Sequence, residues 1–143
     1  MATETTQPMD ETQVTRESGT GLDENVAGAL SYLLGFITGI IMYFVEPENE
    51  FVRFHAAQSI ALSAVIVVIS IVLSFIGTIL TSLLFVGNGG SFALFSILSL
   101  LLGLVYLVFA VGSFALWIYM MVRAYQGKTP RIPIAAGLAD RIA

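Results

Sequence analysis

Three long runs of the chain contain no Asp, Glu, Lys, Arg or His: Val26–Val45, Ile60–Val86 and Phe92–Val122. A helix needs about 20 consecutive apolar residues to cross the hydrocarbon core of a bilayer. The pattern therefore predicts an all-α protein, a polytopic membrane helical bundle with spans at about 26–45, 56–86 and 91–122. The composition agrees, because 57% of the residues are hydrophobic and 11% are charged, against about 45–50% and about 25% in soluble domains.

Polar segments flank the apolar region on both sides. Residues 1–25 hold six acidic residues and a single arginine, a composition typical of a disordered segment. We therefore predict an acidic disordered tail at 1–23, a transmembrane helical domain at 24–125 and a short basic tail at 126–143. The chain has no cysteine, so neither a disulfide nor a thiolate metal site is expected.

Local signals set the ends of the predicted helices. Pro47 closes the first apolar run, because proline cannot donate a hydrogen bond to the helix ladder. Asn49 is a suitable N-cap for the second helix. The glycine-rich turn at residues 87–90 predicts that the second and third helices form an antiparallel hairpin.

The first apolar run has two interpretations. It is just long enough for a single crossing, but Gly35 and Gly39 weaken its middle. It can also form two short helices that fold back as a re-entrant pair, which gives four helices in all and requires protein to cover the exposed backbone. The side of the membrane that holds the N-terminus depends on this choice.

Basic residues indicate the orientation of the hairpin. The loop at 46–59 contains Arg53, and the C-terminal region contains Arg123, Lys128, Arg131 and Arg141. Both segments lie at the same end of the hairpin, so the positive-inside rule places both in the cytoplasm. We thus expect a multi-pass protein of the cell membrane. Arg123, Lys128 and Arg131 are also suited to contact anionic lipid.

Small and hydroxyl residues recur at steps of three and four within the apolar runs. The sequence predicts that they form helix-packing seams, whose members are Gly35, Gly39, Ser63, Ser70, Ser74, Gly77, Ser99, Gly103 and Ser113. In lipid, such seams allow close backbone approach and hydrogen bonds between helices. The other interpretation, that the hydroxyl groups line a conduction path, lacks the intramembrane charge that usually marks an ion route.

The segment 46–59 gathers three glutamates, one arginine and the only histidine of the chain. On a helix, Arg53 and His55 project about 160° apart and cannot form one site. The acidic residues lack the spacing of a metal box, and no orienting acid accompanies the histidine as a catalytic nucleophile would require. The sequence thus indicates no catalytic, cofactor, metal or nucleic-acid site.

Three stretches nevertheless carry a resemblance: "ENVAGALSYLLGF", "FVRFHAAQSI" and "AYQGKTPRIPI". They resemble a family of small prokaryotic membrane proteins of uncharacterised function, which is similar to the twenty-kilodalton subunit of the protein translocon in the chloroplast inner envelope. The resemblance implies a bundle of four membrane-embedded helices and a part in moving proteins across a membrane. It singles out one candidate interaction surface, made of Phe51, Arg53, His55, Gln58 and Ser59.

Together these observations predict a non-enzymatic membrane protein that acts in a complex with other membrane proteins or with itself. A role in protein translocation is what the resemblance adds. The alternative is a small channel or carrier with helix seams lined by serine and threonine.

Overall fold

The computed structural model describes residues 18–87, 89 and 91–142. In this part of the chain every regular element is a helix, which confirms the predicted fold class. The five helices are α1 (Glu24–Leu30), α2 (Phe36–Val45), α3 (Glu50–Gly87), α4 (Phe92–Tyr125) and α5 (Pro133–Ile142).

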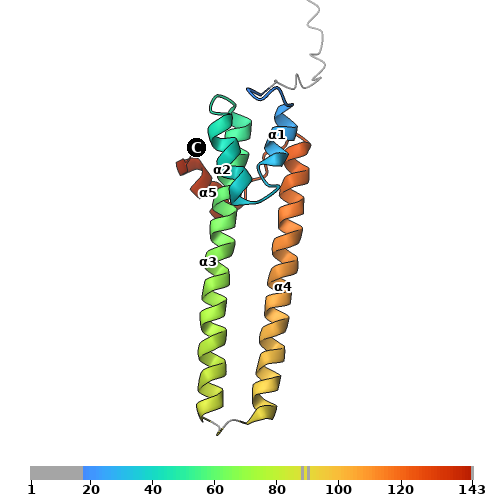
Figure 1. The fold of residues 1–143 in the computed structure, drawn as a ribbon. Coiled ribbons are helices and arrows are strands. Elements are labelled where there is room, and N and C mark those ends of the chain that lie inside the picture. The colour runs from blue at the N-terminus through green and yellow to red at the C-terminus, as the bar shows by residue number, and fades with distance from the viewer. Residues whose placement is uncertain (1–17, 88, 90, 143) are drawn as a thin grey trace, which may run out of the picture.

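The first apolar run is broken into α1 and α2 (Figure 1). The chain reverses at Gly35, whose φ of 62° and ψ of −127° suit glycine. The hydroxyl of Thr38 supports the turn by accepting from the amide of Leu34 and donating to the carbonyl of Ser31. With seven and ten residues, these helices are about 10 and 15 Å long, so neither crosses the core of a bilayer. In the structure the first run therefore forms two short helices that fold back, as in the second interpretation, and we call α1 and α2 the re-entrant pair.

α3 and α4 form the expected antiparallel hairpin (Figure 1). Both are long and apolar enough to cross a membrane. With 38 and 34 residues they are about 57 and 51 Å long, well beyond a hydrocarbon core of about 30 Å. The excess length belongs to one end of the hairpin, where α1 lies beside α4 and α2 lies beside α3. We call this end, completed by α5, the head.

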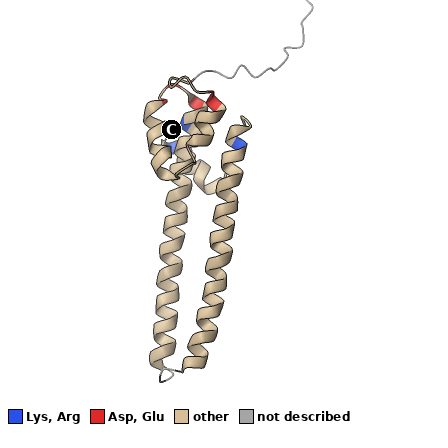
Figure 2. Cartoon of the chain, turned by 45° about the vertical axis from the view of Figure 1, so that its right-hand side comes forward, with Lys and Arg blue, Asp and Glu red and all other residues tan. Residues whose placement is uncertain are grey.

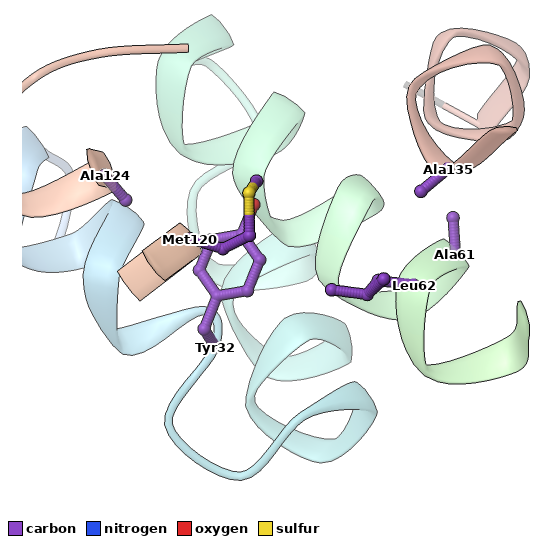
Figure 3. Close-up of a cluster of buried hydrophobic side chains, with 6 residues drawn as sticks. All are labelled: Tyr32, Ala61, Leu62, Met120, Ala124 and Ala135. Carbon is purple, nitrogen blue, oxygen red and sulfur yellow. The ribbon is translucent and has the colours of Figure 1, made fainter. Parts of the chain in front are cut away.

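The buried core lies in the head and is rich in alanine. One cluster consists of Tyr32, Ala61, Leu62, Met120, Ala124 and Ala135, and Figure 3 shows the Tyr32 ring against Met120 and Ala61 facing Ala135. A second cluster joins Ala27, Met42, Val52 and Ala56. Small side chains let the helices of the head approach closely, as they do in membrane interiors.

The predicted basic tail contains a helix, α5, which the sequence analysis did not anticipate. Ala135, Ala136 and Ala139 are buried on one side of α5, and α5 packs against α3. On the other side Ile134 and Leu138 are exposed. The helix was missed because its buried face is made of alanine, which gives only a weak hydrophobic signal.

Residues 1–17 of the predicted disordered tail lie outside the described residues. Residues 18–23 do not continue such a tail but form an ordered turn, in which the amide of Gly21 donates to the carbonyl of Ser18. The carboxylate of Glu46 accepts 2.8 Å hydrogen bonds from the amides of Gly19 and Thr20 and fixes this turn to the head. Residues 18–23 therefore belong to the ordered part of the described chain.

The seam residues have different surroundings. Gly39 lies against α3, where an added Cβ would come within 3.1 Å of the Ala56 carbonyl oxygen, and Gly77 faces Tyr106 of α4. An added Cβ at Gly103 would meet no atom within 4 Å, so α3 and α4 make no close contact at this position, and its place in a packing seam stays a prediction. The side of α4 that faces α3 instead carries larger residues such as Leu102 and Tyr106, about 100° and about 60° around the helix from Gly103.

The serines of the seams bond locally. Ser70 and Ser74 donate to the carbonyls of Ile66 and Ser70, four residues earlier in α3, at 2.7 and 2.8 Å. Ser74 is exposed, whereas Ser63, Ser99 and Ser113 are half-buried. The hydroxyl groups of Ser70 and Ser74 thus satisfy their own helix instead of forming the expected bonds between helices.

Candidate functional site

The charged side chains of the described residues gather in the head (Figure 2). α3 begins there with Glu50 in its first turn, and α4 ends there with Arg123 in its last turn. Because the two helices are antiparallel, the start of α3 and the end of α4 lie at the same end of the hairpin. There they meet the re-entrant pair and α5. The head is therefore the candidate site, and the five residues expected to form an interaction surface all lie in it.

His55 lies at the centre of a buried hydrogen-bond network. Its Nε2 lies 3.0 Å from the carbonyl of Lys128, and its Nδ1 lies 3.0 Å from the Tyr32 hydroxyl. A carbonyl can only accept, so Nε2 carries the proton, and in the neutral ring Nδ1 accepts from Tyr32. His55 thus joins α3 to α1 and to the segment between α4 and α5.

Gln58 completes this network one turn along α3. Its Nε2 donates to the Tyr32 hydroxyl at 3.3 Å and to the carbonyl of Pro130 at 3.0 Å. Its Oε1 has no partner among the described residues. Ser59 extends the same pattern, because its hydroxyl donates to the carbonyl of Gly35 in the re-entrant turn at 3.0 Å.

Arg53 points to a different part of the head, as the helical geometry predicted. It donates to the Tyr43 hydroxyl at 2.8 Å and to the carbonyl of Pro47 at 3.2 Å, and its guanidinium lies 4.5 Å from the centroid of the Tyr43 ring. The Tyr43 hydroxyl donates in turn to the carbonyl of Ile142. Arg53 therefore connects α3 through α2 to the end of α5.

Phe51 fixes the position of α1. Its ring lies 4.6 Å from the His55 ring, centroid to centroid, in an edge-to-face arrangement. An added Cβ at Gly28 would come within 2.7 Å of the Phe51 ring. The first and second stretches of the family resemblance thus contact each other. The five candidate residues form a structural junction, with one set of contacts around His55 and a separate set around Arg53.

The sequence analysis did not single out Tyr32 and Trp117 as site residues. The indole Nε1 of Trp117 donates to the carbonyl of Tyr32, which ties α4 to the broken end of α1. Tyr32 is 1% exposed although it lies in an apolar run. The sequence did contain a signal for Tyr32, which is a polar aromatic residue beside a segment interrupted by glycine. If such a residue is buried, its hydroxyl requires a hydrogen-bond partner.

A polar depression of about 810 Å³ lies on the outer surface of the head, lined by Glu24, Glu46, Glu48 and Glu50 among others. Burial raises the pKa of the Glu46 carboxyl, but the hydrogen bonds that it accepts from Thr20, Gly19 and Ser18 outweigh this effect and hold its pKa below the ordinary value. Within the described residues, no group of three His, Asp or Glu side chains could hold a metal ion. The carboxylate of Glu46 has a structural role here.

An apolar groove of about 390 Å³ lies where α3, α4 and the start of α5 meet. Its walls include Ile66 of α3, Gly112 of α4 and Ile132 before α5, with Ser113 as the one hydroxyl among the lining residues. This groove begins at the edge of the head and continues along the uncharged part of the hairpin. The sequence analysis did not predict it.

Two long apolar helices, a re-entrant pair and a polar junction at one end define a helical integral membrane protein. The sequence comparisons agree with this class. Residues 22–139 match the profile of the magnetosome magnetite crystal formation protein family. The chain belongs to this family.

The relatives are also membrane proteins. A UPF0132 membrane protein of Methanocaldococcus jannaschii is 39% identical over 123 residues, which cover 85% of this chain and 89% of the relative. One from Archaeoglobus fulgidus is 37% identical over 120 residues, covering 84% of this chain and 95% of the relative. No solved structure matches. The predicted small prokaryotic membrane family is confirmed, whereas the similarity to the chloroplast translocon subunit stays a prediction.

Proposed function

We propose that this chain is a non-enzymatic membrane subunit that assembles with copies of itself through the outer face of its hairpin. The observation that carries the proposal is the lack of cover on α4. In the most apolar 18-residue stretch of this helix, no residue is buried within the chain. The hairpin therefore offers almost its whole surface to lipid and to other helices.

A stripe of small residues on α4 supports assembly over simple contact with lipid. Ser96, Gly103 and Ala110 are exposed and follow one another at steps of seven, which keeps them on one face of the helix. Gly103 faces open space, and Ser96 bonds the carbonyl of Phe92 in its own turn. Small residues are what membrane helices use to approach each other closely.

The polar groups of the head support a structural role over catalysis. Both ring nitrogens of His55, the amide nitrogen of Gln58 and the guanidinium of Arg53 are used in bonds that hold the helices together. A catalytic group must instead be free to contact a substrate. Likewise, the hydroxyls of Ser70 and Ser74 bond their own helix, so they give a channel or carrier no specific support.

Cross-linking in the membrane tests the assembly. Because the natural chain has no cysteine, Gly103→Cys places one thiol on the proposed contact face, and Val105→Cys places one about 200° around the same helix. Oxidation in native membranes is expected to give a disulfide-linked dimer of the first variant and little of the second. Equal cross-linking of both, or monomer alone at native abundance, would overturn the proposal.

A more specific role depends on which molecule or particle such a subunit acts on. The resemblance to a translocon subunit suggests exported polypeptides, and the family description suggests the growth of magnetite crystals. The archaeal relatives carry neither term in their names. We favour the assembly itself as the property common to the family, with the cargo set by partners in each organism.

A further inference from the structure

We propose that the apolar groove between α3, α4 and α5 is a lipid-binding site that holds one hydrocarbon chain of an anionic membrane lipid. The groove opens from the side of the hairpin, within the runs that carry no charge. Leu62, Ile66 and Ile69 form its wall on α3, and Phe109, Gly112 and Leu116 form its wall on α4. Residues Ile132–Ala135 close its upper end.

The contents of the groove follow from its lining and its surroundings. Water needs two to four polar partners to occupy a buried space, and Ser113 is the one hydroxyl among the lining residues. A hydrocarbon chain needs none. The volume of about 390 Å³ falls within the range of about 300–1,000 Å³ typical of small-ligand pockets. Because the groove opens to the bilayer, the molecules nearest to it are lipids.

The length of the groove suits a hydrocarbon chain. Leu62 and Ile69 are seven residues apart on α3, a rise of about 10 Å. A helix is about 10 Å across with its side chains, wider than a hydrocarbon chain. The narrower hydrocarbon chain fits, and it runs along α3 and α4 as lipid chains run in a bilayer.

The segment above the groove supplies the charge that selects the lipid. Lys128 and Arg131 are exposed and precede Ile132, the first residue of the segment that lines the groove. Arg131 is held over the Phe54 ring and paired with Asp140, which leaves the Lys128 ammonium as the more available cation. A lipid whose chain hangs in the groove therefore places its headgroup at the charged end of the molecule, beside a basic segment.

Gly112 offers a direct test, because an added Cβ there meets no atom within 4 Å and a larger side chain grows into the groove. Gly112→Leu fills the site. Val111→Phe is the matched control, since Val111 is 59% exposed, is not among the residues that line the groove and lies about 100° away on the same helix. Lys128→Gln removes the charge and keeps the backbone carbonyl that His55 contacts.

The full-length chain is purified in mild detergent, incubated with equal amounts of phosphatidylglycerol and phosphatidylcholine, and weighed by native mass spectrometry. We expect one retained lipid per chain, mainly phosphatidylglycerol, and a loss of at least tenfold in occupancy for Gly112→Leu but not for Val111→Phe. Lys128→Gln is expected to keep the lipid and lower the preference for phosphatidylglycerol by about fivefold.

Three results would overturn the proposal. The wild type could retain no lipid, the Gly112→Leu and Val111→Phe variants could behave alike, or Gly112→Leu could change the number of chains in the particle instead of the number of lipids, which would assign the groove to a second copy. If Gly112→Leu fails to fold, Val65→Phe fills the same groove from α3 and must give the same loss of lipid. The disulfide cross-linking at Gly103 does not bear on these outcomes.

Discussion

The Nε2 of His55 lies 3.0 Å from the backbone carbonyl of Lys128, which is 73 residues further along the chain. This single contact joins the start of α3 to the segment after α4. The Tyr32 hydroxyl at the opposite nitrogen of the same ring adds the first re-entrant helix. Three segments that are distant in the sequence, and that carry the three stretches of the family resemblance, therefore meet at one imidazole.

Removing the Tyr32 hydroxyl is expected to destabilise the head. Tyr32→Phe leaves His55 Nδ1 without a donor and Gln58 Nε2 with one acceptor fewer, both in a buried site. Leaving buried polar groups unpaired costs about 1–3 kcal/mol. Fluorescence of the only tryptophan, Trp117, which bonds the Tyr32 carbonyl, reports unfolding in detergent at this very place.

Tyr125→Phe is the control for that experiment, because Tyr125 is 63% exposed and loses a hydroxyl that faces the surroundings. We expect a change within about 0.5 kcal/mol. The network is also expected to act as a unit, so Tyr32→Phe and Gln58→Leu together should cost less than the sum of the single variants. Strict additivity would show that the two side chains do not share the hydrogen bond.

Gly28→Ala is expected to destabilise the protein although alanine favours helix. The change should gain about 0.5–1 kcal/mol from helix propensity, but the new Cβ would come within 2.7 Å of the Phe51 ring. Overpacking of this kind costs about 1–3 kcal/mol, so the net effect is a loss. Gly137→Ala in α5 has open space around it and should be neutral or stabilising. Equal melting temperatures for both variants would contradict the packing of α1 against Phe51.

The helices with the strongest hydrophobic pattern were the easiest to predict from the sequence. The spans of α3 and α4 are evident from the sequence because an uncharged run of such length has few alternatives in water. α5 buries three alanines against α3, and alanine barely changes a hydropathy pattern. The break in the first run depends on a backbone reversal at Gly35, which the sequence offered as one of two interpretations.

The candidate site was predictable as a location but not as an arrangement. The motif around His55 predicted where the site lies, and helical geometry correctly predicted that Arg53 and His55 point to different parts of the head. The partners of His55 and Arg53 are backbone carbonyls and tyrosine hydroxyls, such as the carbonyl of Lys128 and the hydroxyls of Tyr32 and Tyr43. A backbone carbonyl is present at every position, so no residue type identifies it in advance.

The contact between Glu46 and the turn at 18–23 should depend on pH. The hydrogen bonds that Glu46 accepts hold the pKa of its carboxyl below the ordinary value in the folded chain. A lowered pKa contributes stability that is complete above the unfolded pKa of about 4.3 and is lost as the pH falls through the folded pKa. We therefore expect the amides of Gly19 and Thr20 to be protected from hydrogen exchange at pH 7 and to lose protection below about pH 4.

Glu46→Gln is the control, because the amide keeps only one of the two acceptor oxygens that the Gly19 and Thr20 amides contact and carries no titrating charge. The exchange rates must first be corrected for the intrinsic pH dependence of amide exchange. In this variant the corrected exchange of the Gly19 and Thr20 amides should be faster at pH 7 and should no longer change near the pKa of a carboxyl. A wild-type protection that is constant down to pH 2, or an unchanged pH response in Glu46→Gln, would show that another group holds the turn.

The re-entrant pair makes a definite prediction for topology. α1 enters from the charged end, the chain reverses at Gly35, and α2 returns to the same end before α3 begins. If the hairpin crosses the membrane once in each direction, then Thr20, before α1, and Lys128, after α4, must lie on one side, and Ser91 in the turn between α3 and α4 must lie on the other. The positive-inside rule predicts that the shared side is cytoplasmic.

Single cysteines at these three positions, in a chain that has none, can be labelled with a membrane-impermeant maleimide in intact cells and again after lysis. Ser91→Cys should react in intact cells, and the other two only after lysis. Labelling of Thr20→Cys in intact cells, with Lys128→Cys still protected, would mean that residues 26–45 cross the membrane once, and the broken helix of the structure would not be the form present in the bilayer.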